Sequence, residues 1–263
     1  MVCLYTMKII SYSDLHLEFG SNFMPPADTD ADVMILAGDI ITCKDYKPLS
    51  RFLKNWHKPV LFVMGNHEYY TRRPMAEEDA SFRNWLKEHN PNVTLLLDEN
   101  VTIDGVHFFG GTMWTDFDGS NPLAMLTAQQ QMNDYQMIYT EAGHRLTPSQ
   151  TVALHQTYRE KLTAWLEDGK GGARVVISHH APVINPHTQY KDSPLQPAFN
   201  SLDMLEIIER YQPALWVYGH THECDDQMIG TTRVISNQSG YPSRQRKFEC
   251  EDFDPLGRMI DIT

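Results

Sequence analysis

Short apolar runs recur along the chain, and they constrain its fold more than any other feature. The runs are rich in β-branched and aromatic residues, and they cover residues 7–13, 33–38, 60–65, 93–97, 106–110, 174–179, 214–219 and 232–236. Several are continuously apolar, which is typical of strands that are covered on both faces of a sheet. All of them are far shorter than the roughly 18 apolar residues that a membrane-spanning helix needs.

Helical sequences lie between these runs. The clearest covers residues 147–172, where Thr147 and Gln150 form a capping-box pattern, Pro148 suits the first turn and Gly169 offers a stop. We expect its buried stripe to consist of Leu154, Tyr158, Leu162 and Trp165.

A second helix is expected over residues 200–211, and residues 226–236 are expected to form a hairpin that turns at Gly230 and Thr231. The apolar positions that we assign to the second helix are Leu202, Leu205 and Ile208.

Alternating strands and helices predict a layered α/β architecture, and the late strands predict a second sheet packed on the first. We expect a single domain over residues 1–263.

Charge and cysteine content limit the classes of partner and compartment. The chain has 22 Lys and Arg residues against 34 Asp and Glu residues, a net charge of −12. Long nucleic acid is therefore not expected as a partner, because its backbone binds basic surfaces. Cys3, Cys43, Cys224 and Cys250 form no C-x-x-C pair. Together with a start that is a poor signal peptide, they predict a reduced, cytoplasmic chain without membrane attachment.

Polar side chains with metal-binding chemistry follow five of the apolar runs. In chain order they are Asp14 and His16, then Asp39, then Asn66, His67 and Glu68, then His179 and His180, and finally His220 and His222. Ligands of open α/β sheets gather outside the carboxyl ends of the strands, so these groups are expected to meet. Each group alone also fits a turn, a helix cap or a hydrogen-bonded core residue, but five together favour a common site.

The donor types predict two metal ions. Carboxylates with imidazoles suit Mn, Fe, Ni, Co or Zn and do not suit calcium, and the candidate ligands are too many for one tetrahedral ion. Two close dications repel, so an anion must lie between them. Asp39 can serve as that bridge with one oxygen to each ion. The net positive charge that remains at such a site attracts a phosphoryl group.

The motifs "SDLH", "AGD", "GNHE", "SHH" and "GHTH", in this order, resemble those of the calcineurin-like metallophosphoesterase family, in particular its small bacterial and phage members. The resemblance runs from residue 8 to about residue 240. It implies a four-layer αββα sandwich of two mixed β-sheets flanked by helices. One metal would then be held by Asp14, His16, Asp39 and His222. The other would be held by Asp39, Asn66, His179 and His220. Mn²⁺ is the first choice for both.

Further roles follow from the same resemblance. His67 would be catalytic and face the substrate, and Glu68 would either orient its imidazole or be a surface turn residue. His180 projects away from His179 in an extended segment, so we expect it either to support a ligand from behind or to be structural. Gly219 would let the backbone pass close to the site. Thr42 stands where purple acid phosphatases have a metal-binding tyrosine, so we expect a colourless protein.

Residues 111–139 are too long and irregular for a plain connection, and residues 111–146 are expected to form an insertion on the substrate side. Trp114, Asp116, Asn133 and Asp134 are its candidate substrate contacts, with packed cover as the alternative.

The expected function is hydrolysis of a phosphate ester by a metal-activated hydroxide, foremost in a phosphodiesterase acting on small nucleotide-like substrates. A phosphomonoesterase, a DNA nuclease of the same superfamily and a non-catalytic scaffold are the alternatives. The acidic balance disfavours the nuclease, and the complete set of ligands disfavours the scaffold.

Overall fold

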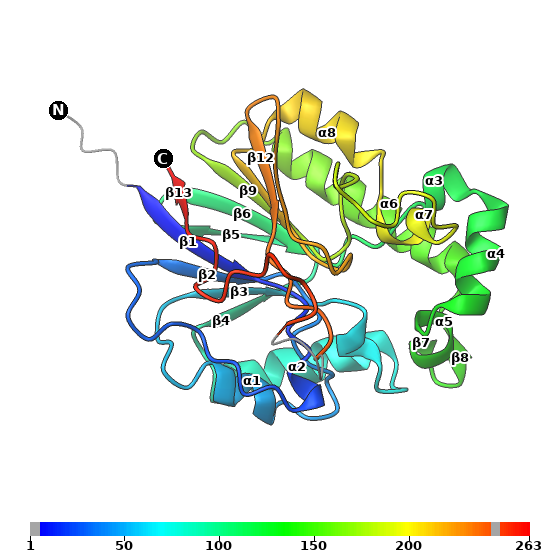
Figure 1. Ribbon diagram of the computed structural model, residues 1–263, viewed down its shortest axis with the longest axis horizontal. Helices are drawn as coiled ribbons and strands as arrows, with labels where there is room; N and C mark the ends of the chain where they lie inside the picture. Colours follow the sequence, from blue (N-terminus) through cyan, green and yellow to red (C-terminus); the bar gives the residue numbers. More distant parts are fainter. Residues whose placement is uncertain (1–5, 243–247) are drawn as a thin grey trace.

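Two β-sheets pack face to face, and helices cover their outer faces (Figure 1). The computed structural model describes residues 6–242 and 248–263, so Cys3 and most of the N-terminal segment lie outside the described residues. The first sheet has the strand order β13-β1-β2-β3-β4. Its strands are β1 (Met7–Tyr12), β2 (Val33–Leu36), β3 (Val60–Val63), β4 (Val93–Leu96) and β13 (Ile260–Ile262). β1 to β4 are parallel, and β13 is an antiparallel edge strand.

The second sheet has the order β11-β12-β10-β9-β6-β5. Its strands are β5 (Glu99–Ile103), β6 (Val106–Gly111), β9 (Arg174–Ser178), β10 (Leu215–Tyr218), β11 (Asp225–Ile229) and β12 (Thr232–Ser236). The four inner strands are parallel, and the two edge strands are antiparallel. Both sheets are therefore mixed, as expected.

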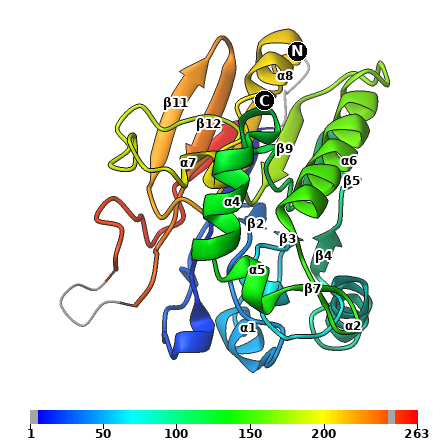
Figure 2. The ribbon, with the colours of Figure 1, turned by 90° about the vertical axis from the view of Figure 1, so that its right-hand side faces the viewer.

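The helices form the two outer layers. The first sheet is covered by α1 (Lys47–Phe52) and α2 (Met75–His89), and the second by α6 (Pro148–Leu166) and α8 (Met204–Tyr211) (Figures 1 and 2). The predicted αββα sandwich is confirmed. Its strands are continuously apolar because both faces are buried. In β1, for example, Ile9 belongs to the core between the sheets, whereas Ile10 belongs to the core under α1 and α2.

Between β6 and α6 the chain forms short elements that extend beyond the carboxyl ends of the strands (Figures 1 and 2). These are α3 (Phe117–Ser120), α4 (Pro122–Gln131), α5 (Asp134–Met137), β7 (Tyr139–Glu141) and β8 (His144–Arg145). Three further short elements are the 3₁₀ helices η1 (Leu17–Phe19) and η2 (His67–Tyr69) and the helix α7 (Gln196–Phe199).

Both predicted helices are present, but the buried face predicted for the second one was wrong. α6 has the predicted capping box at Thr147 and Gln150, and it ends at Leu166, before Gly169. α8 begins only at Met204 and buries Met204, Ile207 and Ile208. The assignment of Leu202 and Leu205 to its apolar face was wrong: they are 41% and 37% exposed. The predicted hairpin is confirmed, with β11 and β12 on either side of Gly230 and Thr231. Over the described ranges, the helices are too short or too polar to span a bilayer.

Candidate metal centre

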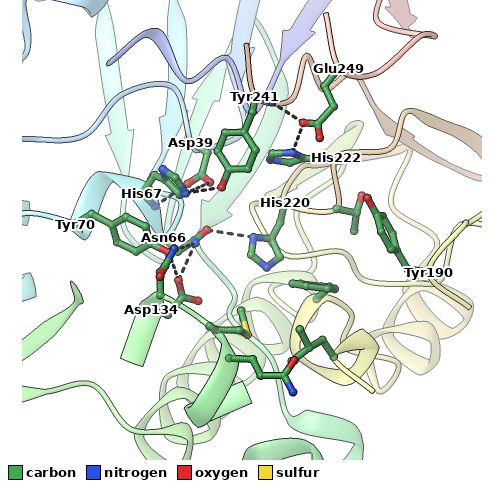
Figure 3. A pocket seen from close by; sticks show the side chains of 16 residues that line it. Asp39, Asn66, His67, Tyr70, Asp134, Tyr190, His220, His222, Tyr241 and Glu249 are labelled. Carbon is green, nitrogen blue, oxygen red and sulfur yellow. Dashed lines mark hydrogen bonds and ion pairs between the residues drawn. The ribbon is translucent and has the colours of Figure 1, made fainter. Parts of the chain in front are cut away.

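The polar residues that follow the strands meet where the carboxyl ends of the two sheets come together. Figure 3 shows four of them, Asp39, Asn66, His220 and His222. Asp14, Asp39 and Asn66 follow β1, β2 and β3 of the first sheet, and His179 and His220 follow β9 and β10 of the second. His16 and His222 lie two residues beyond Asp14 and His220. The structure thus brings all seven predicted ligands together at one site.

The backbone of this site is strained. Five of the seven candidate ligands have a positive φ: Asp14 (52°), His16 (44°), Asp39 (54°), His220 (73°) and His222 (52°). A left-handed backbone costs about 1–3 kcal/mol per non-glycine residue and persists where the surroundings enforce it. Such strain clusters at functional sites, and here it aims the side chains of consecutive loops at one point.

Three side chains form a first cluster of donors. Nε2 of His222 lies 3.1 Å from Nε2 of His16 and 3.4 Å from Oδ1 of Asp14. Oδ2 of Asp39 lies 4.0 Å from Nε2 of His16. Asp14, His16 and His222 have the spacing of a metal site.

A second cluster lies beside the first. Oδ1 of Asn66 is 3.0 Å from Nε2 of His179 and 3.1 Å from Nδ1 of His220. Oδ1 of Asp39 is 3.4 Å from Nε2 of His179. Asp39, His179 and His220 again have metal-site spacing. The two oxygens of Asp39 are therefore divided between the clusters, Oδ2 toward the first and Oδ1 toward the second.

The donor chemistry fits cations. Among the described residues, Nε2 of His220 is buried without a hydrogen-bond partner, and Nδ1 of His16 has only the Glu18 carboxylate beside it, at 3.5 Å. Burial opposes a proton on His179, but the Asp39 carboxylate outweighs it and raises the pKa of His179 to about 9. Burial likewise opposes a proton on His222, but bonds to Asp14 and Glu249 raise the pKa of His222 to about 10. A site that draws positive charge to its imidazoles in this way is suited to bind divalent ions.

Two glycines allow the loops to approach. A Cβ on Gly219 would lie 1.9 Å from Oγ of Ser13 and 2.6 Å from Oδ2 of Asp14, which agrees with the close passage expected of this residue. A Cβ on Gly65 would lie 2.2 Å from Oδ1 of Asp39. Side chains at either position would displace a candidate ligand.

His67 lies at the mouth of the site, where Glu18 and Tyr241 hold its ring. Its Nδ1 is 3.3 Å from Oε1 of Glu18, and its Nε2 is 3.0 Å from the Tyr241 hydroxyl. Burial lowers the pKa of His67, but the carboxylates of Asp39 and Glu18 outweigh burial and raise it. The same Oε1 lies 3.5 Å from Nδ1 of His16. Glu18, which the sequence motifs did not indicate, thus supports two site histidines.

Both interpretations of Glu68 were wrong. Its side chain is fully buried, and its carboxylate accepts the backbone N–H groups of Asp39, Ile40, Ile41 and Gly65. It therefore fixes the loop that carries Asp39 and does not touch the ring of His67.

His180 has the structural place that was expected of it. Its Nδ1 faces the carbonyl oxygen of Thr112 at 3.4 Å, and its ring lies against the ring of His220 with 4.1 Å between centroids. Burial lowers the pKa of His180, and so does the neighbouring His179. His180 thus packs as a neutral ring behind a candidate ligand.

The four candidate substrate contacts in segment 111–139 lie in different environments. Trp114 is 4% exposed and packs between Tyr69 and His180, so for this residue the packing alternative is confirmed. Asp116 caps α3. Asn133 and Asp134 both line the pocket beside the metal centre, and the buried carboxylate of Asp134 accepts from the side-chain amide of Asn66.

A pocket of about 340 Å³ opens onto the candidate metal centre (Figure 3). Besides the candidate ligands, its lining is rich in aromatic and amide side chains, namely Tyr70, Gln131, Asn133, Tyr190, Phe199 and Tyr241. Glu249 lies at its edge, where its Oε2 accepts from the Tyr241 backbone N–H and lies 2.8 Å from Nδ1 of His222. The sequence analysis gave no role to Glu18, Tyr70, Tyr190, Tyr241 or Glu249. Glu18 and Tyr70 lie just beyond the SDLH and GNHE motifs, and no local pattern indicates that their side chains turn back to the site.

Comparisons with known proteins agree with this architecture. A sequence model of the family described as calcineurin-like phosphoesterase matches residues 7–224. The uncharacterized protein L509 of Acanthamoeba polyphaga mimivirus is 26% identical, over 97% of this chain and 99% of its own. The solved structure of phosphopantetheinyl hydrolase (PptH) from Mycobacterium tuberculosis matches with a TM-score of 0.73 and 20% identity, covering 97% of this chain and 95% of that one. The protein TT1561 of Thermus thermophilus matches with a TM-score of 0.56 and 16% identity, covering 89% and 90%.

The family match, together with the clustered His and Asp side chains at the strand ends of an αββα sandwich, supports a metal-binding hydrolase of phosphoric esters. The family match covers most of the chain, and the chain belongs to the calcineurin-like phosphoesterases.

Proposed function

We propose that the protein is a two-metal phosphohydrolase that acts on diesters of small, nucleotide-like molecules. The observation that carries the two-metal part is the division of Asp39, whose oxygens face two separate donor clusters. A carboxylate in that position neutralises part of the repulsion between two dications. Mn²⁺ is the proposed ion because it accepts mixed nitrogen and oxygen ligands.

The proposed ligands follow the two clusters. One ion is held by Asp14, His16, Asp39 and His222, and the other by Asp39, Asn66, His179 and His220. Such ions, when bound, lower the pKa of water and withdraw charge from the phosphoryl group. The chain itself positions the ester, supplies the anionic ligands and shields the reacting group from bulk water.

His67 is the proposed catalytic residue. Its Nε2 lies at the pocket, 4.0 Å from Oδ2 of Asp39, and the raised pKa favours the protonated ring. A protonated imidazole there stabilises phosphoryl oxygens or gives a proton to the leaving oxygen. Replacing His67 with Ala should slow an alkyl diester, whose leaving group needs a proton, far more than a p-nitrophenyl diester. An equal loss on both substrates would refute the acid role.

The volume of the pocket, about 340 Å³, supports the diester preference, because a diester needs space for a second substituent on phosphorus. Gln131, Met132 and Asn133 of segment 111–146 line the same pocket as Tyr190 and Tyr241, so we propose this segment as the substrate-side insertion. The likeness to PptH adds a phosphopantetheinyl ester to the candidate substrates. The net charge of −12 disfavours DNA. Cys43, Cys224 and Cys250 are free, which supports the proposed cytoplasmic location.

The deciding experiment compares two synthetic substrates. The protein is stripped of metal, restored with Mn²⁺, and assayed with bis-p-nitrophenyl phosphate and p-nitrophenyl phosphate. We expect metal-dependent hydrolysis with a preference for the diester, and no activity in Asp39→Asn. A monoester preference would refute the diester part. Activity that is unchanged in metal-free protein would refute the whole proposal.

A further inference from the structure

The side-chain amide of Asn66 has two distinct environments (Figure 3). Its oxygen faces the second donor cluster, 3.0 Å from His179 and 3.1 Å from His220. Its nitrogen donates to Oδ1 of Asp134 at 2.9 Å and to the Tyr70 hydroxyl at 3.1 Å. The amide is thus held from the side opposite the candidate cation.

Orientation matters for an amide ligand. The oxygen and nitrogen of asparagine have nearly the same shape, but only the oxygen has lone pairs for a cation. A flipped amide would direct N–H groups at the ion. Oδ1 of Asp134 accepts hydrogen bonds from both Asn66 and Tyr70, so it selects the nitrogen end of the amide.

Asp134 is well placed to hold this orientation. It is 2% exposed, and Tyr70 is 9% exposed, so water does not compete freely for the amide. Asp134 belongs to α5, 68 residues away from Asn66 in the chain. The bond therefore connects the segment beyond β6 to a ligand that follows β3.

We propose that Asp134, supported by Tyr70, is a positioning residue that keeps Oδ1 of Asn66 directed at the second cation. This inference rests on the proposed two-metal function. Asp134 acts through Asn66 and does not itself coordinate the ion or contact the reacting phosphorus. Segment 111–146 then contributes to metal binding as well as to the substrate pocket.

The test counts metal ions. Asp134→Leu removes the acceptor at similar side-chain size, and Mn²⁺ affinity is measured by equilibrium dialysis, with electron paramagnetic resonance to detect coupled Mn²⁺ pairs. The wild type should bind two ions. The variant should bind the first normally and the second about 10–100-fold more weakly, the usual cost of losing an outer partner. Asp116→Leu is the control: it removes a carboxylate of the same segment that accepts from the backbone N–H groups of Asp118 and Gly119, and this variant should bind metal as the wild type.

A second substitution distinguishes a positioning role of Asp134 from a general structural role. Asn66→Asp offers an oxygen on either side, so a carboxylate at this position needs no orientation. The double variant Asn66→Asp/Asp134→Leu should therefore regain the second ion. If leucine prevents folding, Asp134→Ala with the same second substitution gives the same comparison.

Three outcomes would overturn the inference. Wild-type affinity for both ions in Asp134→Leu would show that Asp134 is not needed. Equal defects in the single and double variants would show a purely structural role. A wild type that binds fewer than two ions would overturn the two-metal proposal itself, whereas the first two outcomes leave that proposal intact.

Discussion

Gly219→Ala tests whether the metal centre depends on the close approach of the two sheets. Gly219 directly precedes His220, and a Cβ there would lie 1.9 Å from Oγ of Ser13 and 2.6 Å from Oδ2 of Asp14, where ordinary contact begins at 3.4 Å. Ser13 cannot easily give way. Its Oγ is bonded to Oδ2 of Asp14 at 2.5 Å and to the carbonyl oxygen of Ala37 at 3.0 Å.

The cost can be worked from these contacts. Gly219 does not have a positive φ, so alanine is not strained by its own backbone and the penalty is steric. The Ser13 hydroxyl must move by roughly 1 Å or more, and overpacking of this kind costs about 1–3 kcal/mol. The new Cβ also clashes with Oδ2 of Asp14, so the cation proposed to bind Asp14 should bind more weakly.

Urea unfolding of the metal-free protein measures the first effect, and Mn²⁺ binding measures the second. Gly171→Ala is the matched control, because no atom lies within 4 Å of its new Cβ and its φ is not positive. Its free energy of unfolding should stay within about 0.5 kcal/mol of the wild type. Adding Ser13→Ala to Gly219→Ala should restore part of the stability. Wild-type unfolding and metal binding in Gly219→Ala would refute the reasoning.

Three further predictions concern the same site. Asp39→Asn removes a negative charge from between the two donor clusters, so we expect dialysis to show loss of metal together with activity; retention of both ions would exclude a bridging role. In the folded, metal-free protein the pKa values of His179 and His222 are raised to about 9 and about 10. The protonated rings therefore stabilise the fold, fully below the unfolded pKa of about 6.5, and this stabilisation is lost as the pH rises through about 9 and 10. Binding of Mn²⁺ must displace these protons, so its affinity should rise with pH by about tenfold per unit for each proton displaced, and a flat profile between pH 6 and 9 would contradict this. Trp114→Ala should lower the free energy of unfolding by about 3–5 kcal/mol with an unchanged KM, because Trp114 is buried; a raised KM at unchanged stability would show that it contacts substrate.

The sandwich and the groups that meet in its metal centre were predictable because both depend on local patterns. A strand buried on both faces is almost continuously apolar, and a polar residue at its carboxyl end, such as His179 after β9 or Asp39 three residues after β2, must lie at that end of the sheet. β5 and β13 were missed because one is a half-buried edge strand and the other has three residues.

The residues that support the site were not predictable, because they approach it only in three dimensions. Glu68 follows His67 in the chain, but the two lie in the 3₁₀ helix η2, where neighbouring side chains point in different directions. The ring of His67 is held by Glu18 instead, and the amide of Asn66 by Asp134. No spacing rule connects these pairs, which are 49 and 68 residues apart.

The position of the site between two sheets links metal binding to folding. Each donor cluster takes ligands from both sheets: Asp14 meets His222 in one, and Asp39 meets His179 in the other. A cation in either cluster therefore ties the end of one sheet to the end of the other. Binding to the folded state alone stabilises it by an amount that grows with the ratio of ion concentration to Kd. That gain offsets the strain of five left-handed candidate ligands, so the metal-free chain relies on the hydrophobic core between the sheets, which includes Ile9, Phe108 and Val217, to keep them together.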